Sequence, residues 1–135
     1  MDLRFIEGIE NIKYRNALLS EYLGKEVHID IDRPIGYIHK KEKYSLHYTI
    51  NYGYIKDVLG GDGEDLDVYL MGVNDPVDKY DCKIIAAIRR KNDIEDKLVA
   101  APLGMNFSEE QIKAAVDFQE QYYNSFIITD KNDIK

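Results

Sequence analysis

Apolar residues recur along this chain with two different periods, and the change of period predicts where helices and strands lie. From Phe5 to Gly24 they recur every three, four or seven residues, which is the spacing of one helix face. Gly24 is well placed to end that helix. Over residues 25–32 the period becomes two, which is typical of a strand with one buried face.

The rest of the chain reads as short strands followed by one more helix. Turn residues separate β-rich runs at about 35–39, 46–55, 66–73, 83–90 and 97–101. Ser108 and Gln111 form a capping box, which predicts a helix over 108–124, and residues 130–135 read as a frayed tail. Five or six short strands with helices at both ends predict a mainly β fold with α: a small five-stranded OB-like barrel with flanking helices, forming a single domain over residues 1–135.

Composition narrows the class of protein. With 135 residues, 44% apolar and 32% charged, the chain suits one soluble globular domain, and its apolar runs fall short of the roughly 18 residues of a membrane span. A net charge of −7 argues against nucleic-acid binding. The start of the chain lacks a secretion signal, and the single cysteine, Cys82, favours a reducing compartment and argues against structural zinc. We therefore expect a cytoplasmic protein that binds neither membrane nor nucleic acid.

The most informative segment is an acidic turn that leads into the strand at 66–73. Asp62, Glu64, Asp65 and Asp67 place four carboxylates within six residues, among glycines that let the backbone curl tightly. If three or four of them converge, their repulsion calls for a cation, and oxygen ligands suit Mg²⁺. A solvated acidic turn remains the alternative.

Two further segments carry candidate chemistry. Residues 91–97, between two expected strands, have a lysine at each end and three carboxylates between them, which suits a phosphate-plus-metal site but also an ordinary charged hairpin turn. Residues 48–54 are rich in tyrosine, whose hydroxyl can donate to a phosphate or hold a water.

Together these segments resemble the soluble family I inorganic pyrophosphatases. The run Asn51-Tyr52-Gly53-Tyr54-Ile55, followed by Asp62-Gly63-Glu64-Asp65-Leu66-Asp67-Val68, is similar to the family's signature region, and the likeness extends over roughly residues 25–125. The resemblance implies a five-stranded barrel that holds Mg²⁺ ions and one pyrophosphate. It also implies hydrolysis of pyrophosphate to two phosphates through attack of a metal-activated water.

The resemblance also implies roles for individual residues. Glu64 falls at the position of the general base, and Asp67 and Tyr52 join it in the expected catalytic group. The expected substrate-binding residues are His28, Lys40, Tyr48, Lys97 and Tyr122. The expected metal ligands are Asp30, Asp62, Asp67, Asp93, Glu95 and Asp96, with the choice among the last three left open.

Several positions depart from the family pattern. Glu64 replaces an aspartate, Lys40 or Lys41 stands near an expected arginine, and Tyr123 stands where a lysine is expected. Lysine cannot give the bidentate phosphate contact of arginine. The departures keep two alternatives open: a hydrolase of a nucleotide or other organic diphosphate, and a barrel that has lost catalysis and serves as a phosphate-binding or interaction module. The oligomeric state is also open, a homo-oligomer included.

Overall fold

Five strands close into a barrel in the part of the chain that the structure, a computed structural model, describes: residues 8–91 and 93–134. The elements in chain order are α1 (Gly8–Tyr22), β1 (Glu26–Arg33), β2 (Ile38–Lys40), β3 (Ser45–His47), β4 (Asn51–Leu59), β5 (Asp65–Leu70), β6 (Lys79–Arg90), β7 (Asp96–Ala101), α2 (Glu109–Glu120), β8 (Ser125–Ile128) and a 3-10 turn (Lys131–Asp133). None of the described helices is long and apolar enough to span a membrane.

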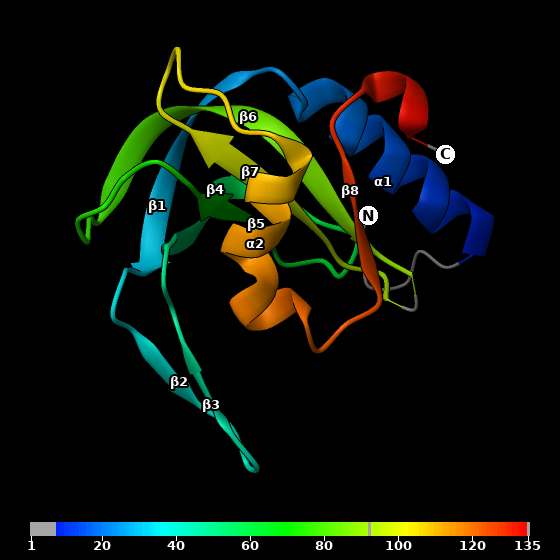
Figure 1. Cartoon of the computed structure of the whole chain (residues 1–135). Coiled ribbons are helices and arrows are strands. Elements are labelled where there is room, and N and C mark those ends of the chain that lie inside the picture. Colours follow the sequence, from blue (N-terminus) through cyan, green and yellow to red (C-terminus); the bar gives the residue numbers. More distant parts are fainter. Residues whose placement is uncertain (1–7, 92, 135) are drawn as a thin grey trace.

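The strand order of the barrel is β1-β4-β5-β7-β6, and pairing of β1 with β6 closes it. The pairs are antiparallel apart from β5 with β7, which run parallel. The last strand, β8, extends the sheet beside β6 (Figure 1). The predicted OB-like barrel is therefore confirmed.

The barrel interior is apolar because every second residue of each strand points inward. Ile29, Ile55, Val68, Ile84 and Leu98 come from the five strands in turn and belong to one buried cluster. Leu19 of α1 and Leu23, which directly follows the helix, belong to the same cluster, and Gly24 comes next with a φ of +88° that suits the turn after a helix.

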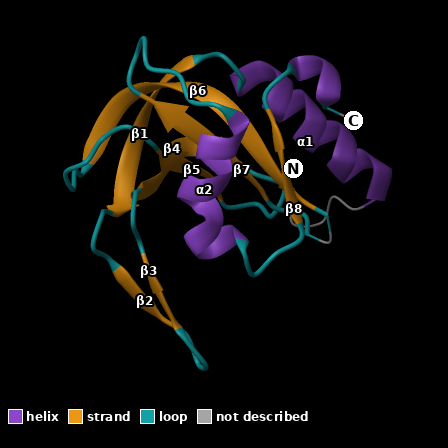
Figure 2. Cartoon of the chain, in the orientation of Figure 1, coloured by secondary structure: helices purple, strands orange, loops and turns teal. Residues whose placement is uncertain are grey.

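The helix α2 lies over the outer face of the sheet (Figure 2), and a second buried cluster packs between the two. The helix begins with the predicted capping box of Ser108 and Gln111 and buries Ile112 and Val116 against the sheet. Its partner on β5 is Tyr69, which is fully buried. Both faces of β5 are thus covered, and the outer face carries the polar groups described below.

The structure corrects several predicted boundaries. The run at 46–55 is broken: residues 45–47 pair with β2 in a hairpin that projects from the barrel, and β4 begins only at residue 51 (Figure 1). The late helix ends at residue 120, and β8 was not predicted. The prediction of a frayed tail over 130–135 is wrong for its described residues, 130–134. There the Asp130 carboxylate accepts a hydrogen bond from the Asn132 N–H and caps a short 3-10 turn. Phe5 lies outside the described residues.

Candidate active site

In the Asn51-Tyr52-Gly53 motif on β4, the two residues that flank Tyr52 in the sequence are fixed by their surroundings. A Cβ atom on Gly53 would lie 1.8 Å from the Asp30 carbonyl oxygen, so only glycine allows β1 and β4 to approach this closely. Asn51 is fully buried, and its side-chain oxygen accepts from the Ile35 N–H at 3.0 Å while its amide donates to the Asp75 carbonyl at 3.0 Å. These two residues hold Tyr52 in place on the outer face.

Strand register brings distant carboxylates into one row on that face. Tyr54 of β4 pairs with Asp30 of β1 on one side and with Asp67 of β5 on the other. Lys97 of β7 follows next, since its Nζ donates to Asp67 Oδ2 at 2.7 Å. Asp67 and Asp30 therefore lie two strands apart, with Tyr54 between them.

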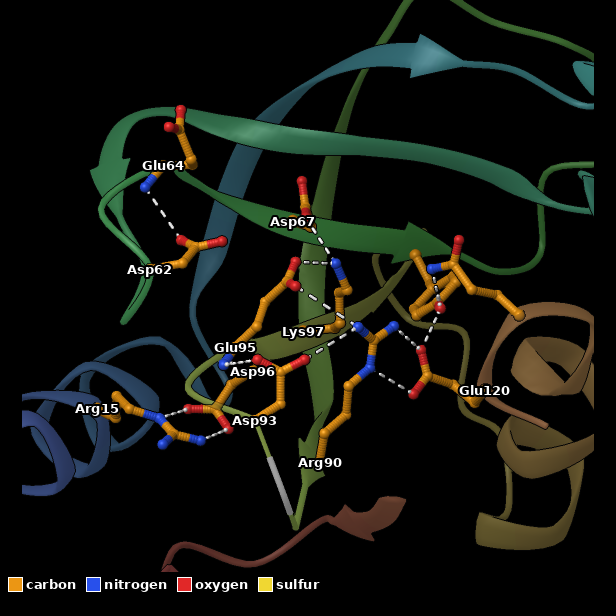
Figure 3. Close-up of polar contacts among 12 residues, drawn as sticks. Arg15, Asp62, Glu64, Asp67, Arg90, Asp93, Glu95, Asp96, Lys97 and Glu120 are labelled. Carbon is orange, nitrogen blue, oxygen red and sulfur yellow. Dashed lines mark hydrogen bonds and ion pairs between the residues drawn. The ribbon is translucent and has the colours of Figure 1, made fainter. Parts of the chain in front are cut away.

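The centre of the site is a set of alternating charges (Figure 3). The Lys97 ammonium is only 4% exposed and contacts both Asp67 and Glu95. Arg90, also 4% exposed, lies 3.5 Å from Glu95 and 3.8 Å from Asp93 through Nη1. Buried cations so close to carboxylates are stable because each charge has partners that offset its desolvation.

Apart from Asp93, these groups line a cavity of about 240 Å³ between β1, the β2–β3 hairpin and the end of α2. The residues lining it are Asp32, Arg33, His39, Lys41, Tyr52, Asp67, Arg90, Glu95, Lys97, Gln119 and Tyr123. Of these described residues, four carry a positive charge and three a negative one, although the chain as a whole carries −7. The cavity is thus locally suited to an anion.

Beneath the cavity, a continuous series of hydrogen bonds joins two guanidinium groups. It runs through Arg33, Tyr48, Gln119, Tyr69, Glu120 and Arg90. Arg33 Nη1 donates to the Tyr48 hydroxyl at 2.5 Å, which donates to Gln119 Oε1 at 2.8 Å. Gln119 Nε2 donates to the Tyr69 hydroxyl at 2.6 Å, which donates to Glu120 Oε2 at 2.5 Å. Arg90 closes the series with bonds of 3.1 and 2.7 Å to the Glu120 carboxylate. Because every member is bonded, the rotamers of both arginines are fixed.

Burial and pairing shift the pKa values of this group. Burial raises the pKa of the Tyr52 and Tyr69 hydroxyls well above their ordinary value, so both stay neutral. Burial also raises the pKa of the Glu120 carboxyl, but hydrogen bonds from Arg90 and Tyr69 outweigh it and bring that pKa below its ordinary value. Burial, with the nearby charges of Arg33 and Lys41, lowers the pKa of His39, which leaves its Nδ1 free to accept from Arg33 at 3.3 Å.

The acidic turn does not bring its carboxylates together. Asp62 Oδ1 accepts from the Glu64 N–H at 3.0 Å, so the turn closes on itself. The exposed Glu64 carboxylate is directed away from Lys97 in Figure 3, whereas Asp67 lies further along on β5. Among residues 8–91 and 93–134, no three potential ligands are grouped for a metal ion. The expected convergence is therefore not found.

Asp96 has a different environment from its neighbours. It is 4% exposed, and both of its carboxylate oxygens accept from Arg15 of α1 at 3.0 and 2.9 Å. Arg89 donates to the same two oxygens at 3.0 and 3.2 Å. Both oxygens of this carboxylate are thus already paired with arginines.

Six further expected site residues lie outside the cavity lining: His28, Asp30, Lys40, Tyr48, Asp93 and Tyr122. His28 is half exposed and bonds Asp81 at 2.7 Å through Nδ1, while Asp30 lies 3.9 Å from its Nε2. Lys40 is exposed on the hairpin. The exposed Tyr122 ring stacks on Tyr44 with centroids 4.4 Å apart.

The structure also brings in residues that the sequence did not single out. Arg33, Arg90 and Gln119 line the cavity. Tyr123, noted in the sequence only as a departure from the family pattern, also lines it, and its ring centroid lies 3.6 Å from the Arg90 guanidinium carbon. The one available signal was Arg33 directly after the alternating strand 25–32. Its approach to Tyr48 depends on the path of the hairpin, which the sequence pattern did not give.

Comparisons with known proteins agree with this fold. The inorganic pyrophosphatase family model matches residues 22–127. The structure is similar to the inorganic pyrophosphatase of Neisseria gonorrhoeae, at TM-score 0.58 and 17% identity over 86% of this chain and 94% of that one. It is also similar to the Thermus thermophilus enzyme, at TM-score 0.56 and 13% identity over 98% and 91% of the two chains. No curated protein sequence matches this chain.

At these identities the solved structures establish the fold. The family match covers most of the chain, including the whole barrel and α2, and supports hydrolysis of inorganic pyrophosphate as the activity. This chain therefore belongs to the inorganic pyrophosphatase family.

Proposed function

We propose that this chain hydrolyses inorganic pyrophosphate in the cavity on the outer face of the barrel, with Mg²⁺ as its metal. The observation that carries the proposal is the cluster of cations, Arg33, Lys41, Arg90 and Lys97, around a small cavity in a chain of this family. A diphosphate is a compact, multiply charged anion, and fixed cations bind it without reorganising.

Arg33 and Arg90 are the proposed main contacts to the phosphoryl oxygens. An arginine presents a planar fork that matches phosphate geometry, and the bonded series beneath the cavity holds both forks in place. Lys97 supplies a point charge between them. Lys40, the expected substrate residue, is exposed on the hairpin, so we assign its role to Arg33 instead.

Asp67 is the carboxylate best placed to orient the attacking water. It lines the cavity and its Oδ2 is fixed by Lys97, whereas the carboxylate of Glu64 is exposed. A carboxylate within reach of the nucleophile can hold the water in line and accept its proton. We therefore place Asp67 ahead of Glu64 in that role.

Magnesium fits the first acidic segment by the chemistry of its donors. Asp62, Glu64 and Asp67 offer hard oxygens, and Mg²⁺ is usually held by one or two carboxylates together with substrate phosphates rather than by a complete protein cage. When bound, the ion neutralises phosphoryl charge and acidifies a bound water. The lack of a three-ligand group among the described residues is compatible with such binding.

The second acidic loop fits a metal less well. Asp96 is occupied by two arginines, and Glu95 and Asp93 already lie beside Arg90. We therefore assign Asp96 to structure, and we propose that Arg90 and Lys97 supply part of the positive charge that the substrate requires.

A larger diphosphate is the second candidate substrate. The stacked Tyr44 and Tyr122 rings are both exposed, and Tyr122 directly precedes Tyr123 of the cavity lining. Exposed aromatic faces beside an anion site suit an organic group with a flat ring.

The test is phosphate release from inorganic pyrophosphate and from a panel of nucleoside and other organic diphosphates, with Mg²⁺ and in excess chelator. We expect Mg²⁺-dependent release from inorganic pyrophosphate at the highest kcat/KM of the panel. A higher kcat/KM for a nucleoside diphosphate would favour the second candidate. Full activity in chelator would refute the metal dependence, and no release from any diphosphate would refute the proposed function.

A further inference from the structure

We propose that α1 positions the active site. Through Asn11, Tyr14 and Arg15, it holds in place the turn that carries Asp62 and Glu64 and the loop that carries Asp93 and Glu95. The inference rests on the proposed function. The family match begins at residue 22, so α1, which spans Gly8–Tyr22, lies almost wholly outside the matched region. From the sequence, the spacing of its apolar residues predicted only that one face of this helix packs on the rest of the fold.

The first contacts hold the turn that carries Asp62 and Glu64. The Tyr14 hydroxyl donates to the Leu59 carbonyl at 2.5 Å, and Asn11 Nδ2 donates to the Gly61 carbonyl at 3.1 Å. Asn11 is only 3% exposed, so this bond forms away from competing water. The two bonds fix the backbone on both sides of Gly60, where β4 ends.

The next contact holds the loop that carries Asp93 and Glu95. Arg15 is 7% exposed and makes a bidentate pair with Asp96, the residue between Glu95 and Lys97. Bidentate pairs fix geometry as well as distance. Since Glu95 and Lys97 both line the cavity, a displacement of Asp96 would move both of them.

The two loops also contact each other beneath α1. A Cβ atom on Gly61 would lie 2.3 Å from the Ile94 carbonyl oxygen and 2.7 Å from Arg15 Cδ. Only a glycine allows this close approach. One helix face, with Asn11, Tyr14 and Arg15 at three- and four-residue spacing, therefore fixes two loops that are far apart in sequence.

Two mild variants test the proposal: Tyr14→Phe and Asn11→Ala, with Lys13→Ala as the matched control on the exposed side of α1. Because a misplacement of about 1 Å at a catalytic group costs roughly a hundredfold in rate, we expect kcat to fall at least about tenfold in Asn11→Ala and less in Tyr14→Phe. The rise in KM should be smaller than the fall in kcat, since Arg33 keeps its bond to Tyr48. Lys13→Ala should leave both constants unchanged.

A purely structural role makes a different forecast. It would lower the melting temperature of the variants while leaving kcat per folded molecule at the wild-type value below that temperature, and this result would overturn the proposal. Equal losses in Lys13→Ala and Asn11→Ala would overturn it as well.

Hydrogen exchange separates this proposal from the proposed function, because it needs no activity. In Asn11→Ala we expect faster amide exchange in residues 60–64, and in residues 93–95 through the close contact between Gly61 and the Ile94 carbonyl, with the barrel strands unchanged. Faster exchange confined to α1 would refute the positioning role even if the wild type hydrolyses pyrophosphate. If the wild type shows no hydrolysis but both loops loosen, the proposed function fails and the structural coupling stands.

Discussion

Replacing Glu120 with Gln should lower stability sharply, because it removes the charge that balances Arg90. The two side chains are 5% and 4% exposed, and their bidentate bonds measure 3.1 and 2.7 Å. Breaking a buried ion pair by removing one partner costs about 3–5 kcal/mol. Arg90 keeps weaker contacts to Glu95 at 3.5 Å and Asp93 at 3.8 Å, so we expect the lower end, about 3 kcal/mol. For a chain of this size that loss corresponds to a fall in melting temperature of roughly 10 °C.

Urea unfolding of the wild type and Glu120→Gln at neutral pH measures this loss directly. Glu110→Gln is the matched control: it makes the same chemical change on the exposed face of the same helix, and we expect it to shift the free energy of unfolding by no more than about 0.5 kcal/mol. If the free energies of unfolding of Glu120→Gln and the control differ by less than about 0.5 kcal/mol, the hydrogen-bonded series does not stabilise the site as described.

The same pair predicts a pH dependence. The folded state holds the pKa of Glu120 below its ordinary value of 4.5, through the bonds from Arg90 and Tyr69. The unfolded chain thus binds a proton on this group more readily than the folded protein does. Its stabilising contribution is present in full above the unfolded pKa and is lost as pH falls through the folded pKa. The stability gap between the wild type and Glu120→Gln should therefore shrink on acidification below about pH 4. A gap that widened there would contradict the pairing.

Two further substitutions probe the site and its scaffold. Arg33→Lys should raise KM for pyrophosphate about tenfold, because lysine lacks the planar guanidinium fork that Tyr48 holds in place. Lys40→Ala should leave KM unchanged. If steady-state kinetics gave equal KM values for the two variants, Arg33 would not belong to the site. Gly53→Ala should lower the free energy of unfolding by more than about 3 kcal/mol or abolish folding, since its Cβ would lie 1.8 Å from a β1 carbonyl oxygen. Gly60→Ala, whose Cβ would have its nearest contact at 3.5 Å, should lower it by about 1 kcal/mol or less. Similar unfolding curves for the two variants would disprove the close approach of β1 and β4.

Local periodicity was sufficient to predict most of the fold. The period-two pattern at 25–32 and the capping box at Ser108 are decided by neighbours in sequence, and both elements form as expected. Residues 125–128 were missed because a four-residue segment with three apolar residues carries little local signal, and this strand forms through pairing with β6. The hairpin likewise depends on a break between 47 and 51 that alternation alone does not mark.

The site could be predicted only in part for a similar reason. Tyr52, Asp67, Glu95 and Lys97 follow from motif residues on adjacent strands, and all four line the cavity. Arg33 becomes a cavity residue only once the hairpin places it against Tyr48. The buried pairing of Asp96 could not be predicted either, because its partner Arg15 lies 81 residues away in the sequence, on α1.

Phosphate release from pyrophosphate by purified wild type and Asp67→Asn, with and without Mg²⁺, tests the central claim most directly. The change is nearly isosteric and the Asp67 side chain, which lines the cavity, is only half-buried, so the fold should persist while activity falls by orders of magnitude. Melting curves recorded beside the assay confirm that the variant is folded. We predict Mg²⁺-dependent hydrolysis by the wild type and its loss in Asp67→Asn. Wild-type turnover in the folded variant would contradict the placement of catalysis in this cavity.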